Sequence, residues 1–289
     1  MKIKAHPEHN YKAIFTDTGT TLHLRYDSKL PYGELEYPEI YDVAINNLCY
    51  GGCQYCYIAA TKRGHNYANV CDKAHQFFGG MTENQRPLQI AIGGAGEATL
   101  HPEFPDFLKT IYDLGIMPNY TTNGMHLTPT VLTATAKYVG GVAVTCHKHL
   151  KRFWQAAIDK LAPITRLNLH IIPMSIGDVD DFVTIFDEYK DKVEYFVLLP
   201  YQAIGFGKAV DIKPVYDYLF DTVLANFTPT DLKKVAYGAY FYDELVQRPW
   251  INADIYEHGL FSKYLDMDNN MTLFRSSYEW ATPLKEHLL

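Results

Sequence analysis

The chain has 289 residues, of which 47% are hydrophobic and 20% charged, the composition of an ordinary globular protein. Its net charge of −7, from 26 Lys and Arg against 33 Asp and Glu, argues against a large nucleic-acid interface, since such surfaces are normally basic. No apolar run has the length of a membrane span, and the first residues lack the apolar core of a signal peptide. We therefore expect a cytoplasmic protein with no membrane partner.

Residues 1–40 have the pattern of a lead-in to the main fold. Two β-prone runs, Tyr11–Phe15 and Thr20–Tyr26, flank the turn residues 16–19. This arrangement predicts an N-terminal β-hairpin.

From Tyr41 onwards, short apolar runs alternate with longer helical patterns, which predicts βα units and a parallel sheet. The six strands are expected at Tyr41–Ile45, Leu88–Ile92, Met117–Thr121, Gly141–Thr145, Arg166–Pro173 and Val193–Pro200. The helices between them are expected at Asp72–Phe78, Pro105–Leu114, Pro129–Tyr138, Leu150–Leu161 and Val179–Tyr189. Eight units close a barrel, so six predict a partial (β/α)6 barrel of the TIM type, with ligands at the carboxyl ends of its strands.

The first of those ends is followed by the sequence N-L-C-Y-G-G-C-Q-Y-C-Y, which contains Cys49, Cys53 and Cys56. Three thiolates on one short loop can hold three irons of a 4Fe–4S cluster and leave the fourth iron open to another ligand. The alternative is a zinc knuckle or a chance cluster of cysteines. Zinc sites usually combine two C-x2-C pairs, and this sequence has no second pair.

The second strand is followed by Gly93-Gly94-Ala95-Gly96-Glu97. Glycines at the end of a strand let the backbone approach a ligand closely. The carboxylate of Glu97 can accept hydrogen bonds from a ligand ammonium group. Such a turn is often only structural, but its distance after the cysteine loop favours a binding role.

The C-x3-C-x2-C spacing, with Tyr55 just before the third cysteine, resembles the radical S-adenosylmethionine (radical SAM) superfamily. The resemblance covers about residues 41–207. It implies that Cys49, Cys53 and Cys56 hold a 4Fe–4S cluster whose open iron chelates S-adenosylmethionine. The cluster would then cleave this cofactor to a 5′-deoxyadenosyl radical that abstracts a substrate hydrogen. It also implies that Gly93, Gly94, Gly96 and Glu97 hold the methionine end, and that flavodoxin or ferredoxin supplies the electron.

Later strand ends provide further candidates. The resemblance implies that Thr145 lies near the ribose or carboxylate of S-adenosylmethionine and that the backbone near Leu199 meets the adenine. Asn168 and His170 are expected in the barrel lumen, as ribose ligands or as a structural polar pair. Cys146 is a candidate catalytic residue, with a small buried core residue as the alternative.

The last part of the chain carries a helical pattern at Pro214–Asn226, a β-prone run at Val235–Tyr242, and a hairpin formed by Lys263–Met267 and Met271–Phe274. We predict an α+β cap here, which gives the boundaries 1–40, 41–207 and 208–289. No cysteine follows Cys146, so this cap cannot hold a second thiolate-ligated cluster.

The function predicted from these features is modification or rearrangement of a peptide or an amino-acid-derived substrate. Radical tailoring or isomerisation of a nucleoside or nucleic-acid base is an alternative. A non-catalytic metal-binding scaffold is another, which the glycine motif and Glu97 argue against. The substrate itself, the fate of S-adenosylmethionine and the oligomeric state stay open at this point.

Overall fold

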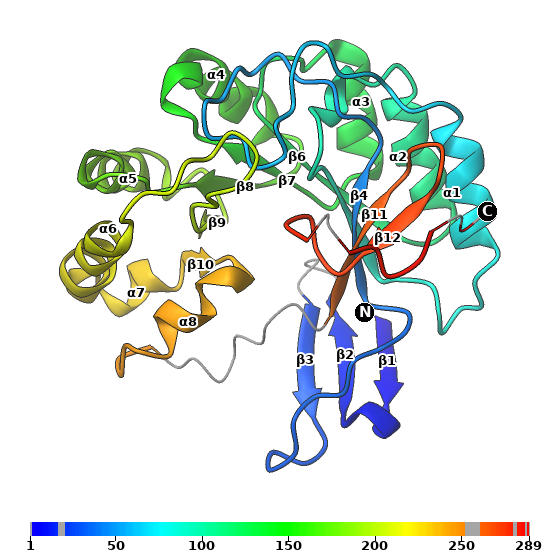
Figure 1. Cartoon of the computed structure of the whole chain (residues 1–289), viewed down its shortest axis with the longest axis horizontal. Helices are drawn as coiled ribbons and strands as arrows, with labels where there is room; N and C mark the ends of the chain where they lie inside the picture. The colour runs from blue at the N-terminus through cyan, green and yellow to red at the C-terminus, as the bar shows by residue number, and fades with distance from the viewer. Residues whose placement is uncertain (1, 17–20, 252–260, 280–281, 287, 289) are drawn as a thin grey trace.

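The computed structural model describes residues 2–16, 21–251, 261–279, 282–286 and 288. Among them, nine strands form the main sheet, in the order β10-β9-β8-β7-β6-β5-β4-β11-β12 (Figure 1). These strands are β4 (Ile40–Ala44), β5 (Gln89–Ile92), β6 (Met117–Thr122), β7 (Gly141–Thr145), β8 (Arg166–Ile171), β9 (Tyr195–Leu198), β10 (Val235–Tyr237), β11 (Ser262–Asp266) and β12 (Thr272–Phe274).

The sheet is parallel from β10 to β11, and β12 pairs antiparallel with β11. In the described chain it has two ends, β10 and β12, so the barrel is open. The predicted partial barrel is therefore confirmed, including all six of its expected strands. Three of these strands are shorter than predicted: β5 begins at Gln89, β8 ends at Ile171, and β9 runs only from Tyr195 to Leu198. β8 and β9 end before Pro173 and Pro200, because proline cannot donate to a strand ladder.

Five long helices connect the strands and cover the outer face of the sheet (Figure 1). They are α1 (Val70–Gly79), α2 (Phe104–Asp113), α3 (Pro129–Tyr138), α4 (Lys151–Leu161) and α5 (Ile176–Tyr189). Alternate strand residues such as Val43, Ile92 and Leu169 are fully buried against these helices. The residues between them on each strand face the lumen, since side chains alternate along a strand. No helix of the described ranges is long and apolar enough to cross a membrane.

The N-terminal segment forms a separate three-stranded antiparallel sheet of β1 (Lys2–His6), β2 (Tyr11–Phe15) and β3 (Thr21–Arg25). The predicted hairpin is β2–β3, although its turn residues 17–20 lie outside the described residues. The sequence analysis missed β1. Tyr11 and Phe15 pack in one cluster with Leu88, so this sheet covers the amino-terminal end of the barrel, opposite the cysteine loop.

The C-terminal segment adds strands to both edges of the main sheet, because β10 pairs with β9 and β11 pairs with β4. The predicted hairpin is β11–β12. The predicted Val235–Tyr242 strand stops at Tyr237, and the chain continues into helical turns after Gly238. The boundaries at residues 40 and 207 stay a prediction.

Short helices lie in the chain between β9 and β11. α6 (Lys213–Asp217) continues through a π-helical turn at Tyr218–Val223 and a 3-10 turn at Leu224–Asn226, over the predicted Pro214–Asn226 helix. They are followed by α7 (Pro229–Leu232) and α8 (Tyr242–Leu245).

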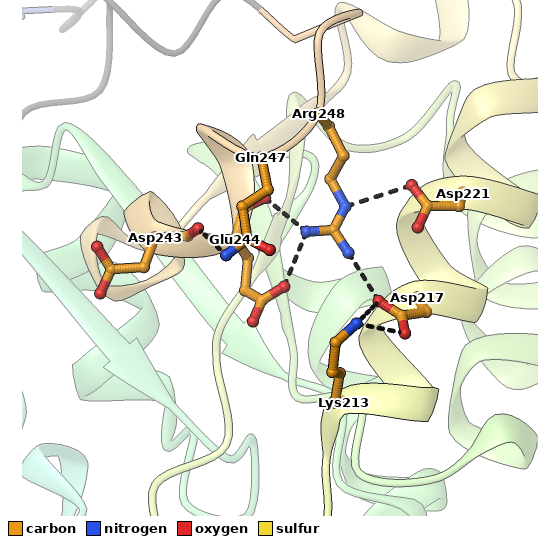
Figure 2. Close-up of polar contacts among 7 residues, drawn as sticks. All are labelled: Lys213, Asp217, Asp221, Asp243, Glu244, Gln247 and Arg248. Carbon is orange, nitrogen blue, oxygen red and sulfur yellow. Dashed lines mark hydrogen bonds and ion pairs between the residues drawn. The ribbon is translucent and has the colours of Figure 1, made fainter.

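Arg248 connects α8 to the helical segment 213–223, which consists of α6 and the π-helical turn (Figure 2). Its side chain is 6% exposed and pairs with Asp217 at 3.1 Å, Asp221 at 3.3 Å and Glu244 at 2.8 Å. The guanidinium also lies 4.7 Å from the centre of the Phe220 ring. This buried cation therefore holds together three carboxylates that come from two separate segments.

Candidate active site

The cysteine loop follows β4 and is held by backbone hydrogen bonds. The Cys49 N–H donates to the Thr61 carbonyl oxygen at 3.1 Å, and the Phe206 N–H donates to the Cys56 carbonyl oxygen at 2.9 Å. Gly205 allows the second contact, since its φ is +62° and a Cβ there would lie 2.2 Å from the Tyr57 carbonyl oxygen. Cys49, Cys53 and Cys56 all line one cavity of about 380 Å³ at the carboxyl ends of the strands.

The sulfurs of Cys49 and Cys53 lie close to the same glycine. A Cβ on Gly51 would lie 3.3 Å from Cys49 Sγ and 3.6 Å from Cys53 Sγ. Thiolates are the typical ligands of iron–sulfur clusters, which usually take four, so this set of three fits a cluster with one open iron. Within the described ranges, no three His, Cys, Asp or Glu side chains are arranged to hold a single metal ion.

Without such a cluster, the thiols of Cys49 and Cys53 are difficult to ionise. Burial raises the pKa of Cys49 to about 11 and the pKa of Cys53 to about 12. Metal binding would therefore displace their protons. The Gly51 N–H donates to Cys49 Sγ at 3.3 Å, which favours the charged form of that sulfur.

Glu97 lies in the same cavity and is 4% exposed. Its Oε1 accepts hydrogen bonds from Thr99 Oγ1 at 2.6 Å and Thr122 Oγ1 at 2.7 Å, and its Oε2 accepts from the Asn123 N–H at 2.8 Å. Burial raises the pKa of Glu97, and these hydrogen bonds oppose that rise. The carboxylate is thus held rigidly, with an orientation set before any ligand arrives.

The glycine motif connects Glu97 to the start of the cysteine loop. A Cβ on Gly96 would lie 2.3 Å from Asn46 Oδ1, so a larger residue does not fit. Asn46 Nδ2 also donates to the Glu97 carbonyl oxygen at 2.9 Å. Gly93 and Gly94 also line the cavity.

Thr145, His170 and Leu199 line the cavity too. His147, which the sequence analysis did not select, joins them, and its Nδ1 lies 2.8 Å from the Tyr55 hydroxyl. Burial lowers the pKa of His170 to about 4 and, with the nearby His149, lowers that of His147 to about 4. Both imidazoles are therefore uncharged at neutral pH.

Two predicted residues lie elsewhere. Cys146 lines a different cavity of about 600 Å³ with Trp154 and Ile171, because its neighbour Thr145 faces the lumen and alternate residues face opposite sides of a strand. Burial also raises the pKa of the Cys146 thiol, which disfavours a nucleophilic thiolate. Asn168 is absent from the cavity wall, and its Oδ1 accepts a hydrogen bond from the Tyr195 N–H at 3.2 Å. The geometry supports a site role for neither residue.

Several wall residues were missed by the sequence analysis: Asp42, Asn123, Ser277 and Tyr278. The sequence could have indicated Asp42, because it places a carboxylate in the middle of the apolar strand β4. Ser277 and Tyr278 carried none, because they reach the site only through the pairing of β11 with β4.

Comparison with solved structures identifies the fold. The crystal structure of Streptococcus suis SuiB bound to S-adenosylmethionine superposes with a TM-score of 0.65 at 12% identity, covering 88% of this chain and 63% of SuiB. SuiB bound to its precursor peptide SuiA gives a TM-score of 0.63 at 14% identity, with the same coverage. The chain has the fold of radical SAM enzymes.

A third structure agrees. Native anSMEcpe with bound S-adenosylmethionine and a peptide gives a TM-score of 0.56 at 12% identity, covering 81% of this chain and 74% of anSMEcpe. The chain thus spans a little under two thirds of the length of SuiB and more of anSMEcpe. No family model and no curated protein matches the sequence.

Proposed function

We propose that the chain is a radical SAM enzyme that modifies or rearranges a peptide or an amino-acid-derived substrate. The observation that carries the proposal is that the three cysteines and the buried Glu97 carboxylate line one cavity at the carboxyl ends of parallel strands. A zinc knuckle or a metal-binding scaffold has no need of that carboxylate or of the glycine turn that carries it.

In this proposal, Cys49, Cys53 and Cys56 hold a 4Fe–4S cluster. When bound and reduced by a flavodoxin- or ferredoxin-like donor, the cluster supplies the electron that converts S-adenosylmethionine into methionine and a hydrogen-abstracting 5′-deoxyadenosyl radical. The protein's part is to bind, orient and exclude water.

The roles of the remaining residues follow from their contacts. Glu97 accepts hydrogen bonds from the cofactor ammonium, a charge-assisted interaction that its three fixed donors orient in advance. The backbone of Gly93–Gly96 lies against the methionine end. Thr145, His170 and Leu199, which line the same cavity, contact the ribose and adenine. The uncharged His170 can donate or accept a hydrogen bond there without adding a buried charge.

A peptide substrate is favoured because SuiB and anSMEcpe, which share this fold, are both seen with bound peptides. The net charge of −7 disfavours a long nucleic acid, but it does not decide between a peptide and a nucleoside.

The experiment is anaerobic reconstitution of the wild type and a Cys53→Ala variant with iron and sulfide, followed by addition of S-adenosylmethionine and dithionite. We expect 5′-deoxyadenosine, detected by mass, from the wild type and none from Cys53→Ala. Cys71→Ala is the matched control, because Cys71 lies on α1 outside the cavity, and it should behave as the wild type. Zinc in place of iron in the reconstituted wild type would overturn the proposal.

A further inference from the structure

A second cavity adjoins the site inside the barrel lumen. Its volume is about 190 Å³, and it shares Asp42, Leu199, Ser277 and Tyr278 with the larger cavity. Sites that enclose a whole small molecule usually have about 300–1,000 Å³. The smaller cavity is therefore suited to one part of a ligand, such as a side chain, whose remainder lies beside the cofactor.

Asp42 stands where the two cavities meet. It lies on β4, between Ala91 on β5 and Tyr264 on β11 in the strand register. Burial alone raises the pKa of its carboxyl to about 6, and no described residue hydrogen-bonds to it or pairs with it as an ion. The Asp42 side chain is partly buried and has no described cation beside it, so an incoming cation would find an uncompensated charge there.

Tyrosine side chains line the same cavities as this carboxylate: Tyr57 lines the larger cavity, Tyr240 the smaller one, and Tyr278 both. The Tyr278 ring centre lies 4.7 Å from that of Tyr57 and 4.7 Å from that of Tyr240, at interplanar angles of 61° and 89°. Tyr57 donates a hydrogen bond to Ser277 Oγ at 3.2 Å and Tyr240 donates to Ser276 Oγ at 2.6 Å, so each hydroxyl has an acceptor other than Asp42. Ring faces beside a carboxylate are the usual surroundings of a bound ammonium or guanidinium group.

The other charges on the wall of the smaller cavity do not neutralise Asp42. Arg275 and Glu279 both line it, both are exposed, and their charges are opposite. In the larger cavity, His147 and His170 are uncharged at neutral pH, so neither imidazole neutralises Asp42.

We propose that Asp42 binds a cationic nitrogen of the substrate, an ammonium or guanidinium group, between the rings of Tyr57, Tyr240 and Tyr278. This inference rests on the proposed function, because it assumes that the larger cavity holds the cofactor. It specifies the substrate class as a lysine- or arginine-like residue or a related amine.

The test is a binding measurement that requires no radical chemistry. Reconstituted protein with S-adenosylmethionine and no reductant is titrated with N-acetyl-lysine methylamide, and with the norleucine analogue, which has the same carbon chain and no ammonium group. Saturation-transfer NMR detects the weak binding of such small probes. We expect the wild type to bind the lysine probe at least about tenfold more tightly, the effect of one charge-assisted hydrogen bond. Asp42→Asn should remove this preference.

Tyr278 provides an independent variant pair should Asp42→Asn fold poorly, which thermal unfolding will report. Tyr278→Phe keeps the ring and should keep the preference for the lysine probe, whereas Tyr278→Leu should weaken it. Equal binding of the two probes by the wild type, no binding of either, or a preference that survives Asp42→Asn would each overturn the inference.

The result separates this inference from the proposed function. Charge-dependent binding in a protein that never forms 5′-deoxyadenosine would contradict the proposed function and leave a cation site. Formation of 5′-deoxyadenosine without charge-dependent binding would contradict the role of Asp42 alone.

Discussion

Asn123 donates its backbone N–H to Glu97 Oε2 over 2.8 Å, while its side-chain Nδ2 lies 3.7 Å from Cys49 Sγ. One residue at the end of β6 therefore contacts both the buried carboxylate and a cysteine of the loop. Because the donor to Glu97 is a backbone group, the position of the carboxylate depends on the path of the chain after β6. The two halves of the proposed cofactor site are thus fixed relative to each other.

Replacing Glu97 with glutamine should weaken cofactor binding and leave the fold intact. The variant loses a charge-assisted hydrogen bond to the cofactor ammonium, an effect of roughly 1.5–3 kcal/mol, or about 10- to 100-fold in affinity. Calorimetric titration of the reconstituted protein with S-adenosylmethionine measures this change. Glu103→Gln, next to α2 and outside the cavity, is the control and should bind normally. Unchanged affinity in Glu97→Gln would remove Glu97 from the site.

Two glycines of positive φ near the cysteines should respond differently to alanine. A Cβ on Gly205 meets the Tyr57 backbone at 2.2 Å, whereas one on Gly52, at a φ of +67°, meets nothing within 4 Å. We expect Gly52→Ala to cost about 1 kcal/mol of folding free energy from backbone strain alone. Gly205→Ala should cost about 2–4 kcal/mol, because overpacking adds to that strain. Urea unfolding measures the loss of folding free energy in both variants. Equal losses would show that the backbone near Tyr57 moves aside without cost.

Arg248 should contribute more to stability than any exposed lysine near it. Arg248→Met leaves Asp217, Asp221 and Glu244 without their shared cation, at an expected cost of about 1–3 kcal/mol, because the carboxylates keep partial access to water. Lys213→Met removes the pair of an exposed lysine with Asp217 and should cost less than about 1 kcal/mol. Chemical denaturation of both variants provides the comparison. A larger loss in Lys213→Met would contradict the central place of Arg248.

The stability of the ligand-free chain should depend on Asp42 in a defined pH range. The pKa of this carboxyl is about 6 in the folded chain against an ordinary value of 3.8. Between about pH 4 and pH 6, the unfolded chain releases the proton while the folded chain keeps it, so the wild type loses stability as the pH rises. The loss is about 2–3 kcal/mol and is complete above pH 6.

Asp42→Asn has no such proton to lose, and this makes the comparison specific. The variant should be less affected between pH 4 and pH 6, so its stability relative to the wild type should rise over this range and then level off. Thermal unfolding of both proteins at several pH values measures the difference. A difference that is independent of pH would mean that Asp42 ionises normally in the folded chain.

The parts of the site that lie close together in sequence were predictable. The cysteine loop and the Gly93–Glu97 turn each follow a strand, and parallel strands bring their carboxyl ends to one edge. Strand alternation predicts that Thr145 and Cys146 face opposite sides, and the two residues line different cavities. Asn168 shares a face with His170 but lies two residues further from the carboxyl end, about 7 Å along the strand.

The remaining parts depend on pairing across the whole chain. Ser277 and Tyr278 reach the site because β11 pairs with β4, a contact between segments more than two hundred residues apart. Short apolar runs at the end of a chain do not reveal which edge of a sheet they will join. For this reason the sequence predicted a cap where the structure has β10 and β11 extending the sheet on both sides.

The pairing of β4 with β11 also affects how the chain is made. β4 gains a neighbour on one side once β5 has been synthesised, but its other edge stays unpaired until the ribosome has passed Asp266. At typical rates of synthesis this interval lasts roughly 10–40 s. During that time an open strand edge lies beside the newly made cysteine loop, and such an edge can pair with another chain.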